Sequence, residues 1–284
     1  MEFFDVLEKE DVEKEDIEFK EKSKDYILSM PHGGTLIPKR FLKNLKIERG
    51  ILIGSDLYTD KLFDTEKGIQ IISNLSVYLV NYSRFRMGSK DKKLPKHLQH
   101  DPFQGEFLEG GNALKVNYTN GEKEELLKYY DRYHEYLEKA IKIMKEEKGY
   151  ALIFDCHSMN SIALENTPDK GEERPDFNIG TLDGNSADKK IIDIFVKNMK
   201  EECRGENLTV KENYPYKGGY ITKKYAEKTN IIQIEIKRDL FMHEGLKTRK
   251  NEFQIKEEGL KKINKILTKV FSKTIKSLNI ENYS

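Results

Sequence analysis

The sequence predicts an α/β protein with a mainly parallel β-sheet, because short apolar segments alternate with longer amphipathic ones. Residues 151–154 are uninterruptedly apolar, which is typical of a buried central strand. Residues 122–147 and 187–202 carry apolar side chains at helical spacing. The 284 residues can bury a complete α/β core, and no linker divides them, so we expect a single domain spanning residues 1–284.

Composition and charge argue against several functional classes. The chain has 50 basic and 49 acidic residues, whereas a nucleic-acid partner requires a patch of one sign. It has no apolar run long enough to cross a bilayer, and its first residues lack the pattern of a signal peptide. Cys156 and Cys203 form neither a disulfide framework nor a Cys-x-x-Cys site. We expect a cytoplasmic protein without nucleic-acid or membrane partners, and the sequence leaves its oligomeric state open.

The N-terminal part of the chain contains the first candidate ligand. Residues 1–24 are rich in charges of both signs, and we interpret them as a solvated lead-in. Residues 26–30 form an apolar strand that runs into Pro31, His32 and two glycines. Glycines let a backbone approach a ligand closely, so His32 is a better ligand candidate than an ordinary loop histidine.

Residues 55–63 predict the start of a helix, with Ser55 or Asp56 as its N-cap. A cap is one role for the Asp56 carboxylate, and a place in a functional site is the other. Asp60 lies one helical turn further on and would share roughly the same face.

Residues 69–82 predict one or two strands that lead into Arg84 and Arg86. Cations at a strand end suit an anionic substrate group, although an ordinary basic turn would contain them too. Residues 94–121 form an irregular excursion, and such long connections often serve as lids or substrate loops. His134 lies on the helix that follows, where a surface histidine flanked by aromatic residues is the simpler interpretation.

The central strand ends in Asp155, Cys156 and His157. Side chains alternate along a strand, so Asp155 and His157 should point one way and Cys156 the other. A carboxylate and an imidazole on one face can form a metal site or a general-base pair, unless the histidine only caps the strand. A second excursion, 161–175, precedes a strand predicted at 177–181.

The C-terminal part offers a glycine loop and a further carboxylate. Aromatic residues frame the glycines of residues 213–220, which suggests a loop pressed against a ligand or a turn packed on the core. The strand predicted at 231–238 sends Gln233, Glu235 and Lys237 to one face. Glu235 is therefore either a catalytic carboxylate or a polar residue on a solvated edge strand. A closing amphipathic helix is predicted at 251–277.

The candidate residues gather at strand ends, where open α/β sheets bind their ligands. His32, His157 and Glu235 lie at or near predicted strand ends, and Asp56 could lie beside them. Two imidazoles and one carboxylate with an open fourth position are the usual ligands of catalytic zinc. Such a metal lowers the pKa of its water to about 7, and a second carboxylate must move the proton. Glu235 is the natural candidate for that second carboxylate.

Taken together, short sequence blocks resemble the N-formylglutamate amidohydrolase family. They follow the family's order and span about residues 26–245. The blocks are 29–34 (Ser-Met-Pro-His-Gly-Gly), 56–63 (Asp-Leu-Tyr-Thr-Asp-Lys-Leu-Phe), 83–85 (Ser-Arg-Phe), 129–130 (Tyr-Tyr), 133–134 (Tyr-His), 155–158 (Asp-Cys-His-Ser), 176–181 (Asp-Phe-Asn-Ile-Gly-Thr), 217–222 (Lys-Gly-Gly-Tyr-Ile-Thr) and 233–235 (Gln-Ile-Glu).

The resemblance implies a three-layer α/β/α sandwich around a mainly parallel mixed sheet. It also implies zinc-dependent hydrolysis of the formyl amide of N-formylglutamate, releasing formate and glutamate. His32, Asp56 and His157 are implied as ligands of one divalent ion, Zn²⁺, and Glu235 as the acid/base. Asp56 is preferred to Asp60 as the ligand because it precedes the Leu-Tyr pair of the family block.

The resemblance further implies residues around the metal and the substrate. Asp155 and Asp60 would support the ligands from outside. The positions implied to bind substrate are Arg84, Lys217, Gly218, Gly219 and Tyr220, with His134 facing the cleft.

The chain departs from the family pattern after the Ser-Arg-aromatic block. The family continues to Asp-Leu-Asn-Arg, whereas this chain has Gly-Ser-Lys-Asp at 88–91. Lysine does not reproduce the planar fork with which arginine binds a carboxylate, so Arg86 becomes a candidate for that role. We therefore expect a small-molecule substrate with a carboxylate, an N-formyl or N-acyl amino acid. The alternatives are a zinc peptidase or peptidoglycan-type amidase, and a non-catalytic binding protein that kept the fold.

Overall fold

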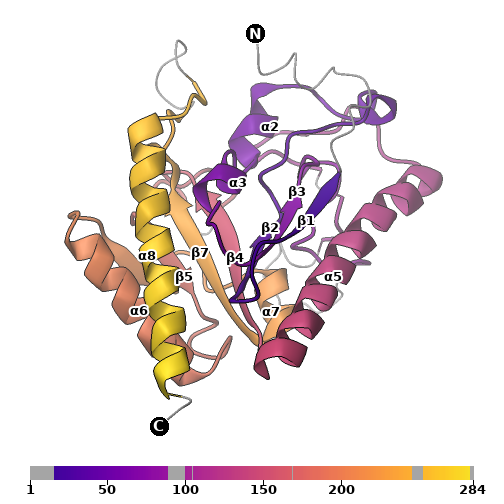
Figure 1. Cartoon of the computed structure of the whole chain (residues 1–284). Helices are drawn as coiled ribbons and strands as arrows, with labels where there is room; N and C mark the ends of the chain where they lie inside the picture. The colour runs from indigo at the N-terminus through magenta and orange to yellow at the C-terminus, as the bar shows by residue number, and fades with distance from the viewer. Residues whose placement is uncertain (1–15, 89–99, 104, 168, 245–251, 282–284) are drawn as a thin grey trace.

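The computed structural model describes residues 16–88, 100–103, 105–167, 169–244 and 252–281. They form a seven-stranded sheet in the order β1-β3-β2-β4-β7-β5-β6 (Figure 1). The strands are β1 (Ile17–Glu21), β2 (Ile27–Met30), β3 (Ile69–Ser73), β4 (Leu152–Met159), β5 (Phe177–Gly180), β6 (Val210–Glu212) and β7 (Asn230–Lys237). The four neighbours β3, β2, β4 and β7 run parallel, while β1 and β5 join them antiparallel.

Helices cover both faces of the sheet. They are η1 (Lys39–Phe41), α2 (Arg49–Gly54), α3 (Thr59–Leu62), α5 (Asn120–Lys148), α6 (Lys189–Arg204), α7 (Tyr220–Ala226), η2 (Arg238–Leu240) and α8 (Glu257–Glu281). Figure 1 shows α6 and α8 on one side of the sheet and α5 on the other. The predicted three-layer α/β/α sandwich is therefore confirmed. No described helix is both long enough and apolar enough to span a membrane.

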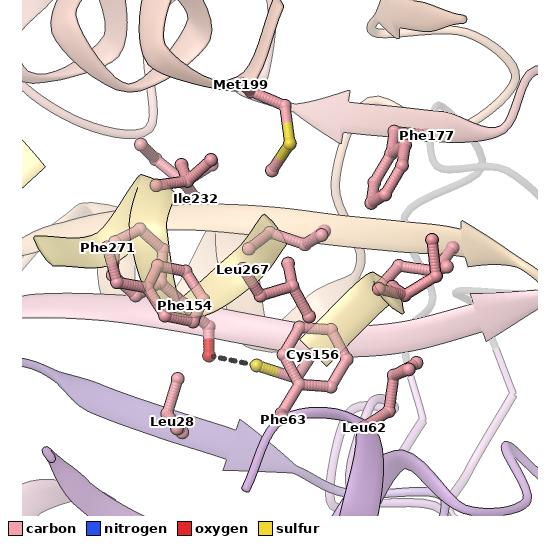
Figure 2. Close-up of a cluster of buried hydrophobic side chains, with 14 of the residues drawn as sticks. Leu28, Leu62, Phe63, Phe154, Cys156, Phe177, Met199, Ile232, Leu267 and Phe271 are labelled. Atoms are coloured by element: carbon pink, nitrogen blue, oxygen red, sulfur yellow. Dashed lines mark hydrogen bonds between the residues drawn. The ribbon is translucent and has the colours of Figure 1, made fainter. Parts of the chain in front are cut away.

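Strand β4 divides its side chains between the two layers as the alternation predicts. Phe154 and Cys156 point into the apolar layer under α8, where the Phe154 ring lies 4.5 Å from that of Phe271 (Figure 2). Ile153 belongs to the opposite layer, which α5 covers. Because successive side chains alternate, Asp155 and His157 face the α5 side at the carboxyl end of the strand.

The long helix α5 has sequence signals at both ends. Thr119 and Glu122 form a capping box, in which the Thr119 hydroxyl accepts from Glu122 N and the Glu122 carboxylate accepts from Thr119 N. Gly149 ends the helix with a φ of 77°, a left-handed conformation that glycine adopts at low cost. The helix thereby holds its buried tyrosine face against the sheet.

Three sequence-based interpretations are wrong. Residues 17–21 are not a solvated lead-in, because they pair with β3 as an edge strand and bury Ile17. Asp56 is not an N-cap, because α3 begins at Thr59 after Tyr58, whose φ is 65°. Glu235 does not lie on a solvated edge, because β7 is enclosed between β4 and β5.

The two predicted excursions contain little regular structure where they are described. An isolated bridge between Leu45 and Leu114 ties the first to the body, and one between Ile162 and Glu173 closes the second. Residues 1–15 of the predicted lead-in and 89–99 around the first excursion lie outside the described residues.

Candidate metal centre

Three side chains from different parts of the chain meet at the carboxyl edge of the sheet. His32 follows β2, Asp56 follows α2 and His157 lies near the end of β4. One potential ligand atom from each lies within 4.8 Å of the others. Oδ2 of Asp56 is 3.0 Å from His157 Nδ1 and 3.6 Å from His32 Nδ1. A backbone hydrogen bond of 2.9 Å from Asp56 N to His32 O fixes the two loops together.

The far nitrogen of each imidazole is held by an oxygen acceptor. His32 Nε2 lies 3.0 Å from Asn81 Oδ1, and that oxygen also accepts from Ser83 N, which fixes the amide orientation. His157 Nε2 lies 3.2 Å from Asp155 Oδ1. Each Nε2 must therefore donate, and each Nδ1 faces Asp56 Oδ2. Nδ1 donates to that carboxylate while it carries a proton, and after losing the proton it can offer a lone pair to an ion. Metal-ligating histidines are typically oriented in this way by their second nitrogen.

Asp155 is itself buried and held from two sides. Its Oδ1 accepts from Ser29 Oγ at 3.1 Å, and its Oδ2 from Thr222 Oγ1 at 3.2 Å. The Ser29 hydroxyl also lies 2.9 Å from the hydroxyl of Tyr133 on α5. These hydrogen bonds hold the carboxylate that lies beside His157 Nε2.

The second oxygen of Asp56 is occupied by a buried arginine. Arg238 Nη2 donates to Asp56 Oδ1 at 2.9 Å, and Ser158 Oγ donates to the same oxygen at 3.3 Å. Arg238 is anchored in turn by Ser158 Oγ at 3.0 Å and by the carbonyl of Ile53 at 2.5 Å. Oδ2 is left facing the two imidazoles, so Asp56 offers one oxygen to an ion.

Burial and neighbouring charges shift the pKa values of all three groups. Burial would raise the pKa of Asp56, but hydrogen bonds from His157 and His32 and the charge of Arg238 lower it well below its usual range. Burial opposes charge on His157, but the carboxylates of Asp155 and Asp56 raise its pKa well above the usual value. Burial lowers the pKa of His32. Two nitrogens and one anionic oxygen form a donor set that suits Zn²⁺, so the residues fit such an ion.

Glu235 lies beside this cluster, directly across from His157 in the pairing of β4 with β7. Burial raises the pKa of its carboxyl to about 7, and the charge of Asp56 adds to that effect. Gln233 Nε2 donates to Glu235 Oε1 at 2.8 Å. A carboxyl in this state can accept or deliver a proton near neutral pH.

The two arginines predicted to bind substrate have different surroundings. Arg84 is half-buried, donates to Ser83 O at 2.8 Å and pairs with no carboxylate among the described residues. Burial lowers its pKa to about 10. Arg86 is exposed, and its Nε and Nη2 donate to the Asp131 carboxylate on α5 at 2.7 and 2.9 Å. Arg84 is thus available to an anion, whereas Arg86 is already engaged.

The glycine loop lies next to the carboxylate of the last strand. Gly219 N donates to Gln233 Oε1 at 2.7 Å, and Gly218 has a φ of 138° that favours glycine. Lys217 is exposed and pairs with Asp183 at 2.9 Å. The ring of Tyr220 lies 4.5 Å from that of Phe85, next to Arg84.

Two predicted residues lie apart from the cluster. Asp60 is on α3 and does not belong to the ligand group found among the described residues. His134 is buried, with Nδ1 3.0 Å from the Tyr225 hydroxyl and Nε2 3.1 Å from the carbonyl of Tyr82. Both ring nitrogens therefore have partners within the protein. Arg238 and Asn81 had no sequence signal beyond their positions beside predicted strands or motif residues, whereas Gln233 belongs to the 233–235 block and was predicted to share a strand face with Glu235.

The buried His134 should make stability depend on pH. Burial lowers its pKa from 6.5 to about 3, so the unfolded chain binds a proton first as pH falls. The stabilisation is complete above about pH 6.5 and declines toward pH 3. We expect urea unfolding of the wild type to lose about 2 kcal/mol from this group between pH 7 and 5. His134→Gln should lack this component, and equal pH losses in both proteins would contradict it.

Comparisons with known proteins identify the family of the chain. A family model described as N-formylglutamate amidohydrolase matches residues 24–242. An N-formylglutamate deformylase from Pseudomonas putida is 28% identical over 229 residues, covering 77% of this chain and 82% of the relative. A second, from Pseudomonas aeruginosa, is 26% identical over 239 residues, covering 80% and 86%.

Solved structures share the fold. The crystal structure of N-formylglutamate amidohydrolase from Ralstonia eutropha has a TM-score of 0.75 at 21% identity, covering 93% of this chain and 98% of that one. The structure of a gene product from Agrobacterium tumefaciens has a TM-score of 0.66 at 14% identity, covering 94% and 97%. At these identities the likeness concerns the architecture alone.

Proposed function

The chain belongs to the N-formylglutamate amidohydrolase family, and on that basis we propose that it is a metal-dependent amidohydrolase acting on an N-formyl or N-acyl amino acid. The observation that carries this proposal is the convergence of His32, Asp56 and His157 beside a buried Glu235. Ligands alone would suit a structural site, but a carboxyl with a pKa of about 7 suits proton transfer.

In the proposed reaction the chain's own residues position the water and move its proton. A divalent ion held by His32, Asp56 and His157 would supply Lewis acidity and lower the pKa of water. Glu235 accepts the proton of the water that attacks the amide carbon. It then delivers that proton to the departing nitrogen as the C–N bond breaks. The two products are the carboxylate of the acyl group and the free amino acid. For a formyl substrate the carboxylate is formate.

Arg84 supplies a positive charge for an anionic oxygen of the substrate. Its guanidinium is partly desolvated and has no carboxylate partner among the described residues, so a substrate oxygen would not compete with a protein anion. Charge-assisted hydrogen bonds from arginine are strong and directional. The same contact would hold a substrate carboxylate or stabilise the developing oxyanion.

Arg84→Met is expected to lower kcat/KM for the N-formyl amino acid by roughly 10²-fold, the usual effect of losing one such donor. Arg86→Met is the matched control, because that side chain is exposed and held by Asp131. It should stay within about threefold of the wild type. A larger loss in Arg86→Met than in Arg84→Met would place the anionic contact at Arg86 instead.

A substrate panel tests the function. Metal-loaded protein is incubated with N-formyl and N-acetyl derivatives of glutamate, aspartate and leucine, and free acid and free amine are measured. We expect hydrolysis of the N-formyl amino acids, with preference for an acidic side chain. Cleavage of peptides or muropeptides alone would favour the peptidase or amidase alternative. Binding without turnover on any substrate would favour a non-catalytic protein.

A further inference from the structure

We propose that Gln233 is a positioning residue, which the backbone of the glycine loop orients so that its amide N–H holds the Glu235 carboxylate in place. The inference rests on the proposed function of Glu235 as the acid/base. Gln233 precedes Glu235 by two positions on β7, so both side chains face the same side of the sheet. Both are buried, with 4% and 7% of their surfaces exposed.

The orientation of the Gln233 amide follows from its partners. Its Oε1 lies 2.7 Å from Gly219 N, and a backbone N–H can only donate. The hydroxyl of Thr222 lies 3.3 Å from the same oxygen. The amide nitrogen is therefore left on the opposite side, 2.8 Å from Glu235 Oε1. A flipped amide would place its N–H groups against Gly219 N–H and its oxygen against Glu235 Oε1. The observed orientation is therefore strongly favoured.

The loop that imposes this orientation is closely packed. A Cβ at Gly218 would lie 2.7 Å from the side chain of Leu182, and φ there is 138°. A Cβ added at Gly180 on β5 would lie within 3.1 Å of the backbone of Lys217. Gly219 N is thereby held at a fixed place above β7. Because Gln233 accepts from Gly219 N and donates to Glu235, it links the Glu235 carboxylate to this fixed backbone.

The contact matters because Glu235 lies in a buried site with another carboxylate nearby. Gln233 is the hydrogen-bond partner of Glu235 in the described structure. A buried carboxylate oxygen without a donor is costly, and the side chain would turn toward another partner. A displacement of about 1 Å can reduce turnover about 10²-fold without preventing substrate binding.

Two substitutions separate this role from simple support of the loop. Gln233→Glu keeps an acceptor for Gly219 N but offers no donor to Glu235 at alkaline pH. Gln233→Met has a similar length and removes both hydrogen bonds. Gln70→Met is the control, because Gln70 is a buried glutamine on β3 of the same sheet whose amide binds the Thr65 carbonyl at 3.2 Å.

We expect Gln233→Glu and Gln233→Met each to lower kcat about 10²-fold at pH 8, with KM and zinc affinity within about threefold of the wild type. Gln70→Met should lose stability but keep kcat. At acidic pH the introduced carboxyl can bind a proton and donate again, so Gln233→Glu should regain activity relative to Gln233→Met. Wild-type kcat at pH 8 in Gln233→Glu, or no relative recovery on acidification, would overturn the proposal.

Crystal structures of both variants decide the contact independently of turnover. We expect Gln233→Glu to keep the contact with Gly219 N while the Glu235 carboxylate rotates away from position 233. An unmoved Glu235 in both variants would overturn the positioning role. If the wild-type protein hydrolyses no N-acyl substrate, the proposed function fails, whereas the displacement of Glu235 still reports on Gln233.

Discussion

Replacing Glu235 by glutamine should remove turnover and leave the metal in place. Glutamine has nearly the same shape but cannot accept a proton from water at neutral pH. General acid–base catalysis usually contributes 10²- to 10⁴-fold, so we expect kcat to fall by roughly 10³-fold. The outer atoms of His32, Asp56 and His157 keep their partners, so metal content and zinc affinity should match the wild type. Formate release and metal analysis on the same preparation measure both effects.

Glu244→Gln provides the matched control for that experiment. Glu244 is a partly buried carboxylate that follows β7, and its Oε1 accepts from Ser161 N at 2.8 Å. An amide oxygen can keep that hydrogen bond, so kcat should stay within about threefold of the wild type. Wild-type rates in Glu235→Gln, or an equal loss in Glu244→Gln, would remove Glu235 from the proposed mechanism.

Asp56→Asn should have the second large effect, on both metal affinity and stability. The substitution removes the anionic ligand and lowers the attraction for a divalent ion, so we expect zinc affinity to fall at least about 10²-fold. It also leaves the buried guanidinium of Arg238 without its counter-charge. Breaking a buried ion pair from one side typically costs 3–5 kcal/mol, so urea unfolding should detect a loss of about that size.

Asp60→Asn tests the other candidate for the carboxylate ligand. Asp60 lies on α3, four residues after Asp56 in sequence, and outside the ligand group found among the described residues. We expect unchanged zinc affinity and a stability change within about 0.5 kcal/mol. Loss of zinc from Asp60→Asn with retention in Asp56→Asn would reverse the assignment.

The fold and the family could be predicted from the sequence because their signals are local. The apolar run at 151–154 predicts the buried strand β4, and side-chain alternation predicts that Asp155 and His157 face away from Cys156. The same alternation places Gln233 and Glu235 together on β7. The resemblance to the N-formylglutamate amidohydrolase family is confirmed by the family model over residues 24–242.

Long-range contacts could not be predicted in this way. Arg238 reaches Asp56 across 182 residues of sequence, and Ser29 reaches Asp155 across 126. No spacing rule connects such positions, so Asp56 has the same local pattern as a helix cap. The edge strand β1 could not be predicted from its sequence for a related reason. Only its pairing with β3 distinguishes it from a charged surface segment.

His134 illustrates the limit of assigning a role by residue type. A histidine beside aromatic residues suits a cleft or a surface equally well in sequence. In the fold, the tyrosine face of α5 packs against the sheet and encloses the ring between Tyr225 and Tyr82. Its hydrogen bonds are thereby satisfied within the core.

Anomalous X-ray diffraction at the zinc edge, from crystals of wild-type protein equilibrated with equimolar zinc, tests the metal assignment most directly. We predict one strong peak bounded by His32 Nδ1, Asp56 Oδ2 and His157 Nδ1, about 2.0–2.2 Å from each atom. A peak elsewhere, or no peak between these three atoms in zinc-equilibrated crystals, would contradict the assignment.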